Sequence, residues 1–265
     1  MYEKVNKFHP DKIADRIAGA LVDMAYKVND NPHIAVEILI GHSKCYIIVE
    51  ADVVISEEEI KAAVYRISRV KDVWIDYNKQ DKNLNNNQKG KTRCGDNGIF
   101  KGCPVTQEQE RLTNFVCYVT EHCPYDGKYL INGNKVTVCQ SNFKDKDILN
   151  VYKGIYDLTI NPLGEWTGGL DVDTGATNRK LGSDMGDGVT GGGLHGKDLS
   201  KADVTLNICA FLEAQKTKEE VKYICNIGDE TVNGHEYQKL VNIAKEYIIS
   251  IGGFEKFAEY GLIRP

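Results

Sequence analysis

The residue types most able to do chemistry gather in one glycine-rich stretch of this 265-residue chain. Residues 164–196 contain 11 of the 25 glycines, and such density indicates backbone that turns tightly or approaches a ligand closely. Four cations and three carboxylates lie in or just after it: Arg179, Lys180, Lys197, Lys201, Asp173, Asp198 and Asp203. Cations suit phosphate oxygens and carboxylates suit magnesium, so the mixture is typical of a polyphosphate site. Taken alone, a solvated charged loop explains it about equally well.

Two known loop motifs are incomplete in this stretch. Gly191, Gly196 and Lys197 satisfy the first part of a P-loop, but Asp198 follows where that motif needs a serine or threonine hydroxyl. The preceding residues also read as loop, not as the apolar strand that a P-loop follows. DVDTG (171–175) lacks the third oxygen ligand and the closing glutamate of a calcium loop. The sequence therefore favours neither of these two sites.

The N-terminal sequence HPDKIAD (9–15) places a histidine and an aspartate at the start of a predicted helix. Pro10 suits the first helical position, because its missing N–H would have no helical partner there. Apolar residues then recur at helical spacing: Ile13, Ile17, Leu21, Met24 and Val28. The start of a helix favours anions, although a lone histidine there is more often a cap or a surface group.

The rest of the chain reads as alternating strands and helices that could hold these segments. Strands are predicted at 34–40, 45–54 and 73–77, with a helix after the capping box of Ser56 and Glu59. This β-α-β-β-α-β order predicts an α+β fold with helices on one face of a sheet. Glu37 lies inside the first of these strands, where a lone buried carboxylate would be costly without a partner.

A weaker version of the same order follows. A helix is expected after Thr106 and Gln109, then a hairpin around Asn132-Gly133-Asn134, a short helix near 145–153 and a strand at 156–160. The last part reads as a helix near 199–214, a strand at 221–227 and a helix near 236–250. We expect three similar subdomains in a pseudo-threefold arrangement, approximately 1–97, 98–160 and 161–265, whose segments can interleave. The polar, Asn-rich residues 78–97 are expected to form a mobile loop.

Composition limits the class of protein. A hydrophobic content of 42% is enough for a sizeable core, and a net charge of -5 disfavours sequence-independent nucleic-acid binding. No apolar run approaches the roughly 20 residues that cross a bilayer, and the polar N-terminus does not resemble a signal peptide. The eight cysteines form no CxxC pair, so reduced thiols are expected in place of disulfides or zinc. We expect a cytoplasmic protein with no membrane partner.

Four stretches resemble, in order, the signatures of one enzyme family, the S-adenosylmethionine synthetases (methionine adenosyltransferases). FHPDKIADRIAGALVD (8–23) is similar to their GHPDKIADQISDAVLD, and RCGDNGIFKG (93–102) to GAGDQGLMFG. INPLGEWTGG (160–169) is similar to INPTGRFVIGG. NRKLGSDMGDGVTGGGLHGKDLSKAD (178–203) is similar to GRKIIVDTYGG with HGGGAFSGKDPSKVD. The resemblance covers most of the chain, which is expected to be a compact, C-terminally shortened member.

The resemblance implies a reaction and a set of residues. Methionine sulfur attacks the ribose C5′ of ATP, and the leaving triphosphate is cleaved to pyrophosphate and phosphate. A leaving group that gathers negative charge needs fixed cations in a water-poor site. The catalytic residues implied are His9, Lys128, Arg179 and Lys197. The ATP-binding residues implied are His9, Asp96, Asp126, Lys128, Trp166, Asp173, Arg179, Lys180 and Lys197.

Further residues follow for methionine and the metals. The methionine-binding residues implied are Glu50, Gln80, Asp173 and Lys201. Asp11 and Asp203 match the carboxylates for two magnesium ions, and Glu37 matches a potassium position, with a water-facing strand glutamate as the alternative. Because the family site lies between two subunits, a homodimer at least is expected, and a tetramer is possible.

Some positions depart from the family pattern. Phe8 replaces the glycine before the histidine, Glu165 replaces an arginine beside Trp166, and the loop 78–97 is shorter than usual. These departures keep two alternatives open. One is a triphosphatase that no longer joins methionine, and the other is a non-catalytic regulatory relative of the synthetase. The presence of His9 and of both metal carboxylates favours the active synthetase.

Overall fold

The computed structural model describes residues 1–87 and 92–265, and its first sheet is built on a hairpin of β-branched strands. β2 (Ile34–Gly41) and β3 (Lys44–Ala51) pair antiparallel, and β4 (Asp72–Lys79) pairs parallel with β3. The parallel step requires a crossover, which α2 (Glu57–Ser68) supplies, and the predicted capping box of Ser56 and Glu59 begins that helix. A distant strand, β9 (Thr174–Ala176), completes the order β4-β3-β2-β9.

The second sheet repeats this pattern of strand directions. β6 (Gly127–Asn132) and β7 (Lys135–Gln140) form the predicted hairpin, and β8 (Asp157–Ile160) pairs parallel with β7. β1 (Tyr2–Val5), from the start of the chain, pairs antiparallel with β6 and completes the order β1-β6-β7-β8. The crossover between β7 and β8 is a 3₁₀ helix, Lys146–Tyr152, which was expected as an ordinary short helix. α4 (Gln107–His122) covers this sheet.

The third unit contains two-stranded sheets, in contrast to the four-stranded sheets of the first two units. β5 (Gly98–Gly102) pairs antiparallel with β10 (Val221–Cys225), and β11 (Thr231–Val232) and β12 (His235–Glu236) form a separate hairpin. The helices beside it are α6 (Ala202–Thr217), α7 (Tyr237–Ser250) and α8 (Phe254–Tyr260). In the described chain the mixed α+β class is confirmed, with several small sheets packed against helices.

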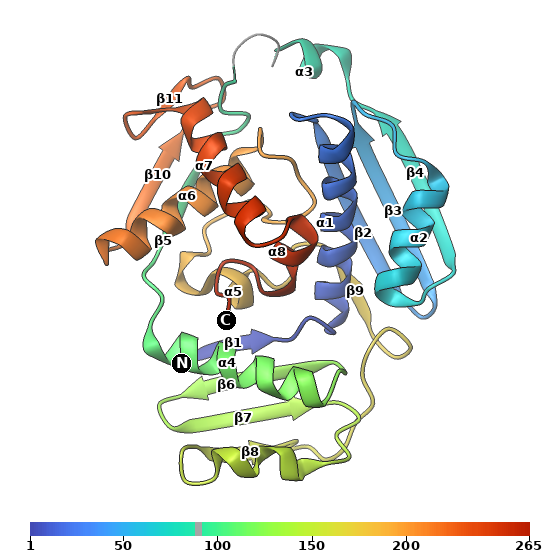
Figure 1. Cartoon of the computed structure of the whole chain (residues 1–265), viewed down its shortest axis with the longest axis vertical. Coiled ribbons are helices and arrows are strands. Elements are labelled where there is room, and N and C mark those ends of the chain that lie inside the picture. Colours follow the sequence, from blue (N-terminus) through green and yellow to red (C-terminus); the bar gives the residue numbers. More distant parts are fainter. Residues whose placement is uncertain (88–91) are drawn as a thin grey trace.

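α1 (Pro10–Val28) lies in the middle of the molecule, as predicted from its apolar spacing (Figure 1). It packs against β2 on one side and α8 on the other. Gly19 allows the close approach to α8, since an added Cβ would overlap the backbone of Phe254. One hydrophobic core joins α1 and the first sheet to α6 and α7, and a second core lies between α4 and β6–β8.

Two expected features are changed or only partly visible. The stretch 78–97 was expected to be a mobile loop, but β4 extends to Lys79 and α3 (Lys82–Asn87) forms one short helix in it. Residues 88–91 of that stretch lie outside the described part of the chain. Among the described helices, none is both long and apolar enough to cross a membrane.

Candidate functional site

His9 caps the start of α1, and one of its ring nitrogens has no partner in the described chain. It is the N-cap of the helix, where its Nδ1 accepts the N–H of Asp11 at 3.1 Å. The side chain is 2% exposed, and Nε2 has no hydrogen-bond partner within residues 1–87 and 92–265. Burial, together with the positive charge of Lys180, lowers the pKa of His9 to about 4. The neutral ring therefore carries its proton on Nε2, from which it can donate to a ligand.

The glycine-rich stretch lies directly against this helix start. Gly175, in β9, packs on the backbone of Pro10 so closely that an added Cβ would overlap the Pro10 carbonyl. The next residue, Ala176, donates its N–H to Asp11 Oδ1 at 2.9 Å. The N–H of Asn178 reaches Asp15 Oδ1, one turn further along α1, at 2.8 Å. The two segments that hold the candidate residues are thus joined within a single chain.

Two predicted phosphate-binding cations converge on Asp11. Lys180 Nζ lies 2.5 Å from Asp11 Oδ2, and a guanidinium nitrogen of Arg179 lies 3.6 Å from Oδ1. Burial alone would raise the pKa of Asp11, but the hydrogen bonds from Lys180 and Ala176 and the charge of Lys180 hold it below its ordinary value. Asp11 is therefore ionised, and Arg179 keeps a half-exposed side chain available to a ligand.

A second sheet contributes the next group. Lys128 is exposed on β6, and its positive charge acts on both His9 and the buried Asp126. Asp126 is 2% exposed, and neither carboxylate oxygen has a hydrogen bond of ordinary geometry in the described chain. Burial raises the pKa of Asp126 to about 6, with Lys128 opposing the shift. The charge of Asp173 acts on the same two residues, so these side chains lie near one another.

Lys197 and Asp203 form a separate pair beside a cavity. Lys197 Nζ lies 2.5 Å from Asp203 Oδ2, and the backbone of Lys197 bridges to Ala35 of β2. Asp203 is in the first turn of α6 and lines a cavity of about 510 Å³, together with Asp96 and Gly192. Asp11 and Asp203 are the two predicted magnesium ligands. In the described residues, neither belongs to a group of three side chains close enough to hold one metal ion.

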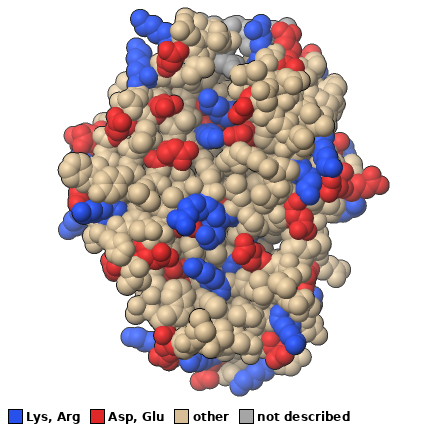
Figure 2. Space-filling view, turned by 180° about the vertical axis from the view of Figure 1, so that it is seen from behind, with Lys and Arg blue, Asp and Glu red and all other residues tan. Residues whose placement is uncertain are grey.

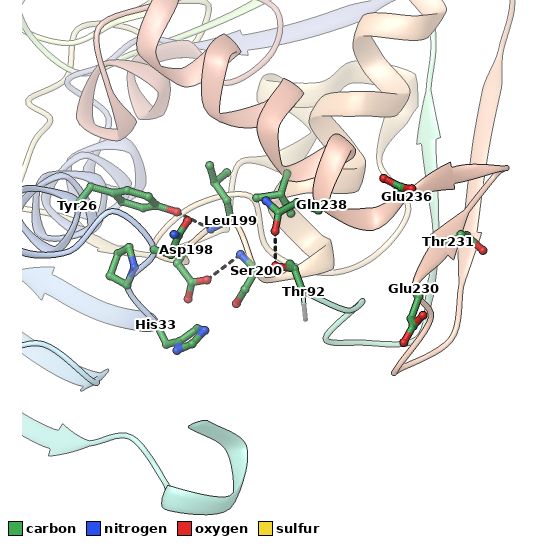
Figure 3. Close-up of a pocket in the computed structure, with 13 residues that line it drawn as sticks. Tyr26, His33, Thr92, Asp198, Leu199, Ser200, Glu230, Thr231, Glu236 and Gln238 are labelled. Carbon is green, nitrogen blue, oxygen red and sulfur yellow. Dashed lines mark hydrogen bonds between the residues drawn. The ribbon is translucent and has the colours of Figure 1, made fainter. Parts of the chain in front are cut away.

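Two of the residues predicted to bind methionine line another cavity. Gln80 and Lys201 line a space of about 220 Å³ with His33. The Oε1 atom of Gln80 is buried there without a hydrogen-bond partner among the described residues. A larger cavity of about 650 Å³ adjoins it through His33 and Ser200. Figure 3 shows Asp198 and Ser200 on one side of this larger cavity and Glu230 on the other.

Three other predicted residues lie apart from these groups. Glu37 and Glu50 are exposed on the outward face of the first sheet, and Glu37 accepts a hydrogen bond from the Thr177 hydroxyl. The premise that Glu37 is a lone buried carboxylate was wrong, because Val36 and Ile38 take the inward positions on either side of it. Trp166 is half-buried, donates to Asn161 Oδ1 at 3.4 Å and lies against Gly168.

Sequence reasoning missed a buried charged cluster under the site. Lys12 and Asp184 are both fully buried, with Lys12 Nζ 2.5 Å from Asp184 Oδ2. Asp15 and His195 complete the cluster, and three of the four residues could by geometry hold a metal ion: Asp15, Asp184 and His195. The ammonium of Lys12 lies among their ligand atoms, 3.3 Å from Asp15 Oδ2 and 3.4 Å from His195 Nε2. The spacing of Lys12 and Asp15 on one helix face was the available signal.

The face opposite to that of Figure 1 shows where charge gathers. Lys and Arg side chains cluster near its centre and acidic side chains lie around them, while large areas carry neither charge (Figure 2). A local group of cations on a chain of net charge -5 is the distribution that a specific anionic ligand requires.

Comparisons with known proteins find both similar sequences and a similar fold. Residues 1–93 match the model of the S-adenosylmethionine synthetase N-terminal domain. The S-adenosylmethionine synthase of Mycoplasmopsis pulmonis is 24% identical in an alignment that covers 83% of this chain and 76% of that protein. By sequence, the chain is therefore similar to S-adenosylmethionine synthases over most of its length.

Two further comparisons agree with this similarity. The S-adenosylmethionine synthase of Acholeplasma laidlawii is 27% identical in an alignment that covers 85% of this chain and 76% of that protein. Among solved structures, an unusual S-adenosylmethionine synthetase from Campylobacter jejuni superposes with a TM-score of 0.77. It covers 99% of this chain and 94% of that one at 18% identity, so it supports the fold alone.

Proposed function

We propose that this chain synthesises S-adenosylmethionine from ATP and L-methionine, as a methionine adenosyltransferase. The observation that carries the proposal is the junction of the α1 start with the glycine-rich stretch. There Lys180 and Arg179 meet Asp11, and the free Nε2 of His9 is buried beside them. Similarity to the family suggests the substrate class, and the junction supplies residues suited to it.

The cations of this junction would receive the triphosphate. Arg179, Lys180 and Lys128 come from two different segments. Arg179 and Lys180 contact Asp11, and the charges of Lys180 and Lys128 act on His9. Fixed cations stabilise the charge that develops on a leaving group without reorganising during the reaction. Because the pKa of His9 is about 4, its ring is neutral near pH 7 and donates from Nε2 to a triphosphate oxygen. His9 would thus stabilise the leaving group by a hydrogen bond.

Two carboxylates fit magnesium ions bound with the triphosphate. Magnesium in phosphate-transfer sites commonly takes one or two carboxylates and completes its shell with substrate oxygens and water. Asp11 and Asp203 each accept one lysine ammonium at 2.5 Å, so each is a buried or nearly buried anion already matched to a cation. Magnesium at these positions would neutralise phosphate charge. The carboxylates of Asp11 and Asp203 would orient it, and Lys180 and Lys197 would turn toward the phosphates.

Methionine would bind in the cavity that Gln80 and Lys201 line. The unpartnered Oε1 of Gln80 can accept from an ammonium group, and Lys201 can pair with a carboxylate. Asp173, Asp96, Asp126 and Trp166 are proposed to contact ATP, with Asp173 also near the methionine amino group. Glu50, on the outward face of the first sheet, is proposed to contact methionine. On the same face, Glu37 and the Thr177 hydroxyl are proposed to hold a potassium ion.

That outward face supports a homodimer. Leu39, Tyr46, Ile48 and Trp74 are all exposed on it, and the rings of Tyr46 and Trp74 stack at 6.5 Å. A contiguous apolar patch of this kind on a sheet marks an interaction surface. Because Glu37 and Glu50 lie on the same face, a second copy would bring its own residues next to them. We therefore propose at least a dimer, with the site completed between two chains.

The finer architecture is part of the same proposal. The two four-stranded sheets share one pattern of strand directions, which supports units related by an approximate threefold axis, near 1–97, 98–160 and 161–265. Strands β1, β5 and β9 would then be exchanged between units. Eight cysteines without a disulfide support a reducing, cytoplasmic setting.

The decisive experiment supplies purified protein with ATP, methyl-labelled methionine, magnesium and potassium. We expect a labelled sulfonium product by mass spectrometry, with equal amounts of phosphate and pyrophosphate. Hydrolysis of added tripolyphosphate with no sulfonium would replace the proposal with the triphosphatase. If the chain forms neither product but changes the rate of an added full-length synthetase, the regulatory role holds instead.

A further inference from the structure

Asn178 lies where the glycine-rich stretch crosses α1, and its backbone takes an unusual form. Its φ of 62° is in the left-handed region, which favours glycine and tolerates asparagine. The family signature GRK has glycine at this position, so the backbone alone does not require a side chain here. The Asn178 amide therefore makes contacts that a glycine at this position could not make.

That amide joins two parts of the stretch that are far apart in sequence. Its Oδ1 accepts the N–H groups of Leu194 and His195, at 2.8 and 2.9 Å, and its Nδ2 donates to the His195 carbonyl at 3.1 Å. The backbone N–H of Asn178 is held by Asp15 of α1. We call these three side-chain bonds the Asn178 clip.

The two parts that the clip joins carry the candidate cations. Arg179 and Lys180 follow Asn178 directly and reach Asp11, while Lys197 follows His195 by two residues and reaches Asp203. Between them runs a glycine-rich turn whose Gly191 and Gly192 line the cavity at Asp203. Gly193, next in the chain, packs on the Asn178 amide, where an added Cβ would lie 2.6 Å from Nδ2.

We propose that Asn178 is a positioning residue, which fixes the Arg179–Lys180 pair relative to Lys197 and the Gly191–Gly193 turn so that both cation groups face one polyphosphate. The inference rests on the proposed function for its substrate. A small misplacement of binding groups can cost about a hundredfold in rate, and glycine-rich backbone is conformationally permissive. The clip thus fixes the position of the Arg179–Lys180 pair relative to Lys197.

The test uses Asn178→Gly, which accepts the same φ and removes only the clip. Asn233→Gly is the matched control, because Asn233 also has a positive φ of 49° and donates to a backbone carbonyl, that of Lys222, in a distant hairpin turn. We expect Asn178→Gly to lower kcat for sulfonium formation by about tenfold or more, with the KM for methionine changed less than about twofold. The control should match the wild-type chain.

A second measurement separates this inference from the proposed reaction. Calorimetric titration with magnesium tripolyphosphate needs no adenosyl transfer, and we expect about tenfold weaker binding by Asn178→Gly than by Asn233→Gly. Amide exchange at residues 191–196 should also be faster in Asn178→Gly alone. Equal tripolyphosphate affinity in the two variants would overturn the inference, even if the wild-type chain is an active synthetase. An inactive wild-type chain with the expected loss of affinity would reject the reaction and keep the positioning role.

Discussion

Lys12 of α1 and Asp184 of α5 (Leu181–Met185) form a fully buried ion pair, with Nζ and Oδ2 2.5 Å apart. His195 also contacts Asp184, at 2.9 Å, so one carboxylate links the helix start to two parts of the glycine-rich stretch. Lys12 and His195 hold the pKa of Asp184 well below its ordinary value against the opposing effect of its burial. The cluster therefore remains charged and joins α1 to the glycine-rich stretch next to the site.

Lys12→Met is expected to destabilise the chain by about 3–5 kcal/mol, because it leaves Asp184 buried without its cation. Chemical denaturation of the purified variant measures this change. The matched control is Arg66→Met, which breaks an exposed pair with Glu255 and should cost less than about 1 kcal/mol. Equal losses in the two variants would show that the cluster does not stabilise the fold.

Asp126→Asn is expected to stabilise the chain near neutral pH. The pKa of Asp126 is raised to about 6 in the folded chain, above its ordinary value of 3.8. The folded chain therefore binds the proton more tightly, and its stability falls as pH rises from about 4 through 6. Removing the charge should recover on the order of 1–3 kcal/mol at pH 7.5 and almost nothing below pH 4.

The check on Asp126 is a series of denaturation curves from pH 4 to 7.5. Asp171→Asn, which changes an exposed aspartate of the neighbouring loop, is the control. The difference between wild type and Asp126→Asn should grow with pH. A difference that stays constant over this range would mean that the pKa of Asp126 is not raised.

His9→Ala is expected to slow adenosyl transfer by about 10²–10³-fold while changing ATP affinity little, because its Nε2 donates to charge that grows during the reaction. Single-turnover kinetics separates this step from binding. His9→Asn is the companion variant, since asparagine can still cap α1 and preserve stability. Normal transfer by either variant would remove His9 from the mechanism.

Trp74→Glu is expected to dissociate the proposed dimer without unfolding the chain, because Trp74 is 61% exposed on the outward sheet face. Sedimentation velocity should show dimers for the wild type and monomers for the variant. Val54→Glu, on an exposed residue that follows β3, is the control and should remain dimeric. A monomeric wild type, or a dimeric Trp74→Glu, would contradict the assigned interface.

Local patterns were sufficient for the regular elements. The apolar spacing of α1, the capping boxes of α2 and α4 and the hairpin at Asn132-Gly133 each depend on neighbouring residues, and all are present. Three strands that complete sheets could not be predicted in this way. β1, β5 and β9 pair with partners far along the chain, and no local signal specifies such a partner.

The candidate site was harder to predict, because it is formed by contacts between residues far apart in the sequence. Family resemblance placed Asp11 and Lys180 together, whereas charge alone left a solvated loop equally open. Asp184 could not be found from the sequence, because its partner Lys12 lies 172 residues away. The apolar neighbours of Glu37 suggested a buried carboxylate, but the alternation of the strand turns Glu37 outward, in agreement with the water-facing alternative.

The central claim is that Lys180, held at Asp11, helps to bind a triphosphate that leaves during synthesis of S-adenosylmethionine. Its most direct test compares sulfonium formation by the wild-type chain and by Lys180→Met, with ATP, methionine, magnesium and potassium present. We expect steady product from the wild type and a loss of about a hundredfold or more in the folded variant. No sulfonium from the wild-type chain, or equal rates from both proteins, would contradict the account.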